Sequence, residues 1–247
     1  MIRLKEFILE KLKISKTETK YHPKSKEELV DIIIREIEAN GTDCSLNHID
    51  VSNITDMSYL FRGGDSRQYL SSKYVNGHPV LSGFDGDISE WNVSNVTSMA
   101  YMFDECHYTG KNGDISNWDV SKVTNMEGMF SNSKYNGDIS KWDVSSVENM
   151  GFMFEKSEYK GDLYNWNVSN VTDMSYMFEK SKYDGDLSNW DVSNVKWFYG
   201  MFRNSSFSGD ISNWQINLKA KGRMDKMFAY SPLENNAPDW YYKYYKS

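Results

Sequence analysis

Six Gly-Asp pairs are the residues of this sequence whose type and regular spacing could bind a cation. The pairs are Gly86-Asp87, Gly113-Asp114, Gly137-Asp138, Gly161-Asp162, Gly185-Asp186 and Gly209-Asp210. If they stack at the ~4.8 Å spacing of neighbouring strands, their carboxylates repel one another unless each caps a turn amide or shares a calcium ion. Calcium takes about six to eight oxygen ligands, and one carboxylate per repeat is too few. We therefore expect turn capping, with no metal and no cofactor.

No other group of residues forms a recognisable catalytic motif. The four histidines, His22, His48, His78 and His107, have no metal-ligand spacing, and the sequence lacks a nucleophile elbow and a phosphate-binding loop. Two cysteines are too few for a disulfide framework or a thiolate metal site. The sequence therefore predicts a protein that is not an enzyme.

A repeat of about 24 residues organises most of the chain. Tryptophan occurs at positions 91, 118, 142, 166, 190 and 214, and the unit reads G-D-[I/L]-S-x-W-[D/N]-V-S-x-V-x-x-M-x-x-M-F-x-x-S-x-[Y/F]-x. A partial unit beginning at Leu46 lacks the Gly-Asp pair and the tryptophan but keeps the other apolar positions. A period of this size is typical of stacked repeats.

The hydrophobic period changes within each unit. Trp142 and Val144 alternate as a short strand requires, whereas Val147, Met150, Met153 and Phe154 follow one another at helical steps. The sequence therefore predicts an α/β solenoid, a leucine-rich-repeat-like stack of strand, turn and short helix with a continuous parallel sheet.

Large apolar side chains recur at the inward positions of every unit. All methionines except Met1 fall on the predicted helical stripe, next to the repeated phenylalanines. The stripe could form a peptide-binding surface, but its spacing faces inward and methionine fills irregular gaps, so we expect it to form the core.

We divide the chain into a helical N-terminal cap over 1–45, the repeat array over 46–230 and an aromatic C-terminal cap over 231–247. Within the N-terminal cap, residues 1–13 are amphipathic, and Ser25 to Gly41 carries an N-cap, an acidic first turn and a closing glycine. An insertion over 62–83 interrupts the array. The aromatic tail could alternatively dock a partner.

The unit resembles the BspA-like leucine-rich repeats, above all the tryptophan- and methionine-rich version of mycoplasma surface lipoproteins, Bacteroidales proteins and phage proteins. The resemblance covers residues 46–230 and rests on the pattern L-x-x-[W/I]-x-V-S-x-V-T-x-M-x-x-M-F. It implies a binding protein, often one displayed at a cell surface, that contacts other proteins.

The outward positions on either side of each tryptophan form the candidate partner-binding surface. These are Glu90, Asn92, Asn117, Asp119, Lys141, Asp143, Asn165, Asn167, Asn189, Asp191, Asn213 and Gln215. Short polar side chains on a preformed surface lose little entropy on binding, which suits recognition of a protein or a glycan. Alternatively, these columns hydrogen-bond to one another and only stabilise the stack.

The net charge of −7 argues against a nucleic-acid partner and modestly favours a partner protein with a basic surface. No segment is apolar enough to span a membrane, and no signal peptide or lipobox is present, so we expect a location in the host cytoplasm or in a virion. Our first hypothesis is a non-enzymatic protein-binding module that uses the polar face and the 62–83 loop. The alternatives are a structural component of a phage virion and a phage inhibitor of a host defence enzyme.

Overall fold

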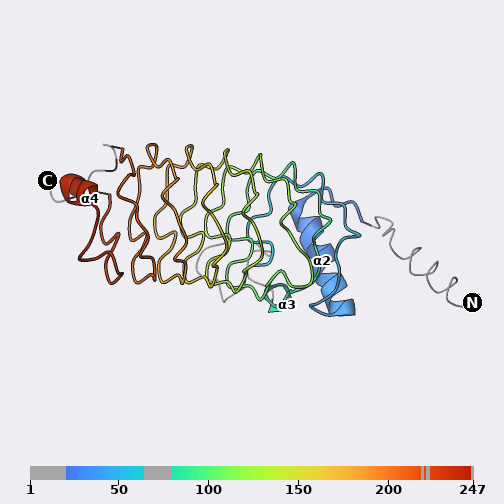
Figure 1. Cartoon of the computed structure of the whole chain (residues 1–247). Coiled ribbons are helices and arrows are strands. Elements are labelled where there is room, and N and C mark those ends of the chain that lie inside the picture. The colour runs from blue at the N-terminus through green and yellow to red at the C-terminus, as the bar shows by residue number, and fades with distance from the viewer. Residues whose placement is uncertain (1–20, 64–78, 218–219, 221–222, 246–247) are drawn as a thin grey trace, which may run out of the picture.

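Successive coils of the chain lie one behind another and build an elongated rod (Figure 1). The computed structural model describes residues 21–63, 79–217, 220 and 223–245. The predicted helix over 1–13 and most of the 62–83 insertion lie outside the described residues.

Helix α2 (Lys26–Asn40) covers the first coil and confirms the predicted helix between Ser25 and Gly41 (Figure 1). The hydroxyl of Ser25 accepts the backbone N–H of Glu28, and Gly41, at φ 87°, donates its N–H to the carbonyl of Ile37. The apolar face of α2 is buried through Leu29, Val30, Ile32, Ile33 and Ile37. Helix α2 therefore closes the apolar interior of the rod at this end.

Two shorter helices lie outside the regular coils. Helix α3 (Pro79–Ser82) belongs to the insertion, and helix α4 (Asp239–Tyr245) lies at the far end of the rod (Figure 1). Trp240 of α4 stacks on Trp214 with ring centroids 6.2 Å apart, and its Nε1 donates to the carbonyl of Ile211. Trp240 thus occupies the position that the tryptophan of a further coil would take.

The predicted α/β solenoid is wrong. Among the described residues, the coils contain no strand and no parallel sheet, and the β-pairing between neighbouring coils consists of isolated parallel bridges. These bridges include Asn125 with Asn149 and Asn149 with Asp173, and therefore do not involve the Trp-Val segment that we expected to form the sheet.

The segment expected to be a short helix is a run of turns. Phe152 and Lys156 adopt left-handed backbone conformations, with φ of 60° and 53°, which an α-helix does not accommodate. The side chain of Asn149 accepts the N–H of Gly151, and Met153 donates its N–H to the carbonyl of Met150. Apolar residues that follow one another at steps of three and one positions point inward in a run of turns as well as in a helix. The hydrophobic period therefore did not distinguish a run of turns from a helix.

Alternate amides of this turn segment bind the next coil. The N–H groups of residues 150, 152, 154 and 156 donate to the carbonyls of residues 173, 175, 177 and 179 at 2.7–3.0 Å. Corresponding bonds join the other coils. A stacked neighbour therefore satisfies the backbone groups that a helix would have satisfied internally.

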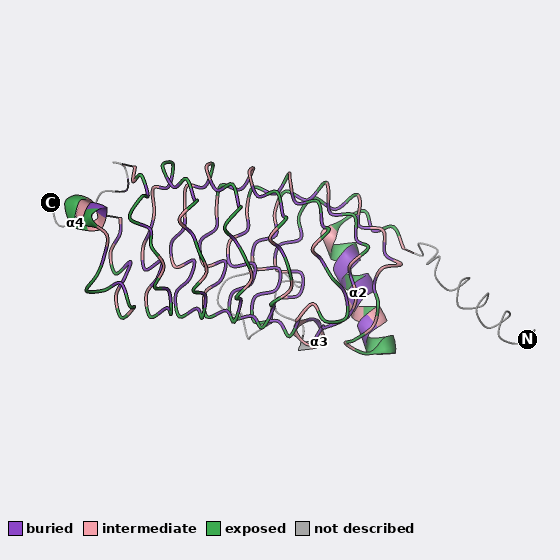
Figure 2. Ribbon diagram, viewed as in Figure 1, coloured by how far each residue is buried: buried purple, intermediate pink, exposed green. Residues whose placement is uncertain are grey.

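The inward side chains form continuous columns, and all methionines predicted for the core are buried. Phenylalanines of successive coils stack with centroids 5.6–5.9 Å apart, as Phe130 does on Phe154 and Phe154 on Phe178. The Nε1 of Trp166 donates to the carbonyl of Ile139 in the preceding coil at 3.0 Å. Figure 2 shows that buried residues recur from coil to coil along the rod.

Candidate functional site

The twelve residues predicted to flank the tryptophans all lie exposed on the surface of the rod. We call this surface the Asx face. Its column after the tryptophans contains Asn92, Asp119, Asp143, Asn167, Asp191 and Gln215. Its column before the tryptophans contains Glu90, Asn117, Lys141, Asn165, Asn189 and Asn213. The structure thus brings the predicted residues together on one surface, although that surface is not a sheet.

Backbone amides hold the carboxylates of the Asx face in place. Asp119 accepts the N–H of Ser121 at 3.1 Å, and Asp143 accepts the N–H of Ser145 at 3.0 Å. Asn92 and Asn167 accept in the same way, so either residue type forms this turn. The hydrogen bond from the Ser121 hydroxyl, followed by that from its N–H, lowers the pKa of Asp119. This carboxylate is therefore ionised at neutral pH.

The column before the tryptophans also bonds to backbone. The Nδ2 of Asn189 donates to the carbonyl of Tyr164, and that of Asn213 to the carbonyl of Ser188 at 2.8 Å. These side chains therefore tie a coil to its predecessor through its main chain, rather than bonding to one another as the stabilising alternative assumed.

The Gly-Asp pairs cap turns, as predicted. Asp138 accepts the N–H of Ser140 at 2.9 Å, and the other five aspartates accept the amide two residues further on in the same way. The N–H of Ser140 contributes most to lowering the pKa of Asp138. Over the described part of the chain, no group of three or more histidine, cysteine, aspartate and glutamate side chains is placed to hold a metal ion.

The sequence reasoning missed a second polar surface, which lies on either side of the buried valines. We call it the Asn-Thr groove. One column of the groove is Asn53, Asn95, Lys122, Ser146, Asn170 and Asn194, and the other is Thr55, Thr97, Thr124, Glu148, Thr172 and Lys196. Between the two columns, three successive coils form an open hollow of about 470 Å³ lined by Ser146, Glu148, Asn170, Thr172, Asn194 and Lys196. The signal in the sequence was the recurrence of Asn-Val-Thr, whose valine we had assigned to the core.

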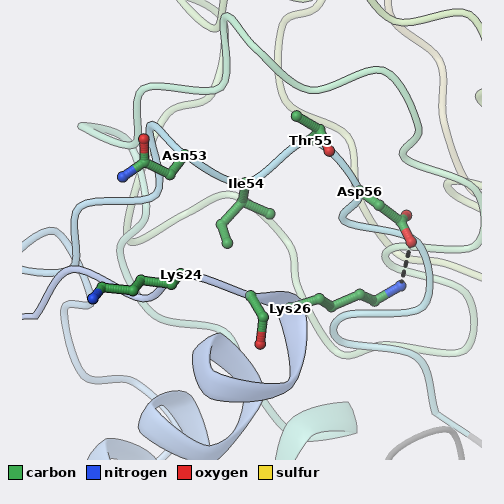
Figure 3. Close-up of a pocket in the computed structure, with 7 residues that line it drawn as sticks. Lys24, Lys26, Asn53, Ile54, Thr55 and Asp56 are labelled. Carbon is green, nitrogen blue, oxygen red and sulfur yellow. Dashed lines mark hydrogen bonds and ion pairs between the residues drawn. The ribbon is translucent and has the colours of Figure 1, made fainter.

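The same columns border a second hollow at the N-terminal end. It measures about 190 Å³ and lies between the start of α2 and residues 53–56 (Figure 3). Lys26 extends to Asp56, with 3.1 Å between Nζ and Oδ2, whereas the amino group of Lys24 points away from that carboxylate. The ion pair joins α2 to the first coil.

Charged side chains form a further column beside the turn segment. Arg62 lies 2.8 Å from Asp104, which is only 5% exposed. Burial raises the pKa of Asp104 to about 6 and outweighs the lowering by Arg62. Further along the column, Arg203 pairs with the buried Glu179. These pairs lie between coils, so we assign them to stacking.

Stacked coils with recurrent side-chain caps define this molecule as a tandem-repeat protein. Two overlapping segments, residues 76–160 and 132–240, match the family described as "Mycoplasma protein of unknown function, DUF285". The two segments span more than half of the chain, and the protein therefore belongs to this family. No curated protein and no solved structure matches the chain. No helix in the described ranges is both long and apolar enough to cross a membrane.

Proposed function

We propose that the protein is a non-catalytic binding protein whose Asx face contacts a partner protein with a basic surface. The observation that carries this proposal is the row of exposed acceptors at 92, 119, 143, 167 and 191, each fixed by a backbone N–H two residues further on. Such side chains are ordered before binding, so contact with a partner costs little further entropy.

Charge supports a basic partner. Asp119, Asp143 and Asp191 place three negative charges on a single column, and the hydrogen bonds from Ser193 lower the pKa of Asp191 as those from Ser121 do for Asp119. A column of ionised carboxylates attracts a basic surface and accelerates encounter with it. Residues 62–83 are proposed to contribute to the same contact, as expected from the position of the insertion in the array.

The relation to BspA-like proteins is part of the same proposal and rests on the sequence motif alone. Members of that family are binding proteins, which favours this class over an enzyme. The proposed binding role does not require a leucine-rich-repeat sheet, because the Asx face is built from capped turns.

The test removes charge without removing the turns. The triple variant D119N/D143N/D191N should fold normally, because Asn92 and Asn167 already occupy this column and accept the same bond. The matched control D138N/D162N/D186N removes three charges from the Gly-Asp turns, which are capped in the same geometry.

Wild type and both variants are immobilised at equal density, and proteins retained from a cell lysate are compared by quantitative mass spectrometry at two salt concentrations. We expect partners that wild type and the Gly-Asp control retain and that the Asx-face variant loses, with retention falling at higher salt. Identical retention by all three proteins would refute the proposal. Equal loss from both variants would show that total charge, not the Asx face, governs binding.

A further inference from the structure

We infer that the Asn-Thr groove binds a neutral oligosaccharide in the hollow over residues 146–196. None of the residues that line the hollow belongs to the Asx face, and the inference holds whichever partner that face contacts. Its volume of about 470 Å³ lies within the range of sites that hold small ligands.

All six residues that line the hollow have polar or charged side chains. Its six side chains are hydroxyl, amide, carboxylate and ammonium groups, contributed in pairs by three successive coils. An aromatic or aliphatic guest would find no apolar side chain among them, and a guest with many hydroxyl groups would find hydrogen-bonding partners on both walls.

Neighbouring coils fix the orientation of the asparagines. The Nδ2 of Asn170 donates to the carbonyl of Ser145, and that of Asn194 to the carbonyl of Ser169, both at 2.7 Å. Each Oδ1 is therefore left as an acceptor at the exposed end of the amide, and no donor from the described residues is paired with either. The hydroxyl of Thr172 likewise donates to the carbonyl of Glu148, at 3.3 Å, and keeps its lone pairs for a guest.

Acceptors fixed in this way require a guest that supplies donors. A sugar hydroxyl donates to an amide or carboxylate oxygen and also accepts from an ammonium group, so it suits Asn170, Glu148 and Lys196 together. A peptide main chain would direct half of its polar groups, the carbonyls, toward a wall of acceptors. A phosphate backbone would meet the same acceptors and only one lysine.

The charges indicate a neutral guest. Glu148 and Lys196 lie in the same column, two coils apart, with Thr172 between them, so the hollow carries no net charge. Three coils at the ~4.8 Å spacing of neighbouring chain segments place the outer two about 10 Å apart, which gives the guest a linear site along the rod.

The test uses substitutions that this column already contains elsewhere. The variant N170S/N194S removes both amide oxygens and follows the precedent of Ser146. N170K/N194K fills the hollow and follows the precedent of Lys122. The control N95S lies in the same column outside the hollow, and it loses an equivalent bond to the carbonyl of Ser52.

The full chain is applied to an array of neutral oligosaccharides, namely cello-, xylo-, manno- and chito-hexaose, together with heparin and an unstructured neutral peptide. Titration of any bound sugar is followed by calorimetry and by NMR shifts of residues 146–196. We expect binding of at least one neutral sugar by wild type and N95S, weakened at least about tenfold in N170S/N194S and abolished in N170K/N194K.

Three results would overturn the inference. They are no neutral sugar bound by wild type, equal affinity in N170S/N194S, and preferential binding of the peptide or of heparin. Thermal melts of all four proteins separate loss of binding from loss of folding. N95S loses the bond to the carbonyl of Ser52 and the bond that Asn95 accepts from Lys122, and N170S/N194S loses two bonds to carbonyls.

Discussion

Replacing Tyr135 by phenylalanine should stabilise this protein, although Tyr135 is a fully buried tyrosine of a regular column. Its ring stacks between Tyr108 and Tyr159, with centroids 5.9 and 6.5 Å away, and its hydroxyl is buried with no hydrogen-bond partner among the described residues. Burial raises the pKa of Tyr135 far above its usual range, which reflects the same apolar surroundings. Phe207 fills the equivalent position two coils after Tyr159, so the column accepts a ring without a hydroxyl.

The magnitude follows from the cost of an unpaired polar group. A buried hydroxyl without a partner costs about 1–3 kcal/mol, and removing it forfeits only a few atom contacts of about 0.1–0.2 kcal/mol each. We expect Tyr135→Phe to gain about 1 kcal/mol and to raise Tm by about 2–4 °C for a chain of this size.

Tyr108→Phe is the matched control in the same column. The hydroxyl of Tyr108 donates to the carbonyl of Gly113 at 2.9 Å, so its removal leaves a buried acceptor and should cost about 1–3 kcal/mol. The reverse change, Phe207→Tyr, introduces an unpaired hydroxyl beside Gly209 and should also cost about 1–3 kcal/mol.

Urea unfolding followed by tryptophan fluorescence measures all three variants against wild type. The midpoint should rise for Tyr135→Phe and fall for the other two, with unchanged m-values. If Tyr135→Phe loses as much stability as Tyr108→Phe, the Tyr135 hydroxyl has a partner and the reasoning is refuted.

Two further predictions concern Asp104 and Asn204. The pKa of Asp104 is raised to about 6 in the folded protein from an ordinary 3.8. The stability that protonated Asp104 contributes to the folded state is therefore fully present below pH 3.8 and is lost as the pH rises through 6. Unfolding free energy should therefore increase by about 2 kcal/mol as the pH falls from 7 to 4.5, because the increase of ~1.4 kcal/mol per pH unit begins only below the folded pKa of about 6. Asp104→Asn should flatten this dependence, and an equally steep increase in the variant would contradict the assignment. Asn204 has φ 53°, so Asn204→Gly should leave stability unchanged or raise it by up to about 1 kcal/mol, and Asn204→Val should lose about 1–2 kcal/mol in thermal melts. Equal stability of the glycine and valine variants would show that this backbone position carries no strain.

The candidate surfaces were predictable to different degrees. The Asx face could be found from the sequence, because residues adjacent to an inward tryptophan point outward in a turn as well as in a strand. The two columns of the Asn-Thr groove are visible in the recurrent Asn-Val-Thr, but the hollow between them could not be predicted, because a hollow depends on the distance between two columns of stacked coils. Its asparagines also gain their fixed orientation only from the carbonyls of the preceding coil, such as that of Ser145 for Asn170.

The sequence by itself determined the repeat length, the direction of stacking and the side chains that fill the core. Burial follows residue type and period, so Met150 and Trp142 lie inside whichever backbone conformation carries them. Only the tertiary structure decided that conformation. An amide such as that of Phe152 can pair within its own helix or with the next coil, and the left-handed backbone at Phe152 becomes tolerable only when the carbonyl of Ser175 lies within reach at 2.8 Å. The choice between helix and turn is therefore a property of the stack, which no single repeat contains.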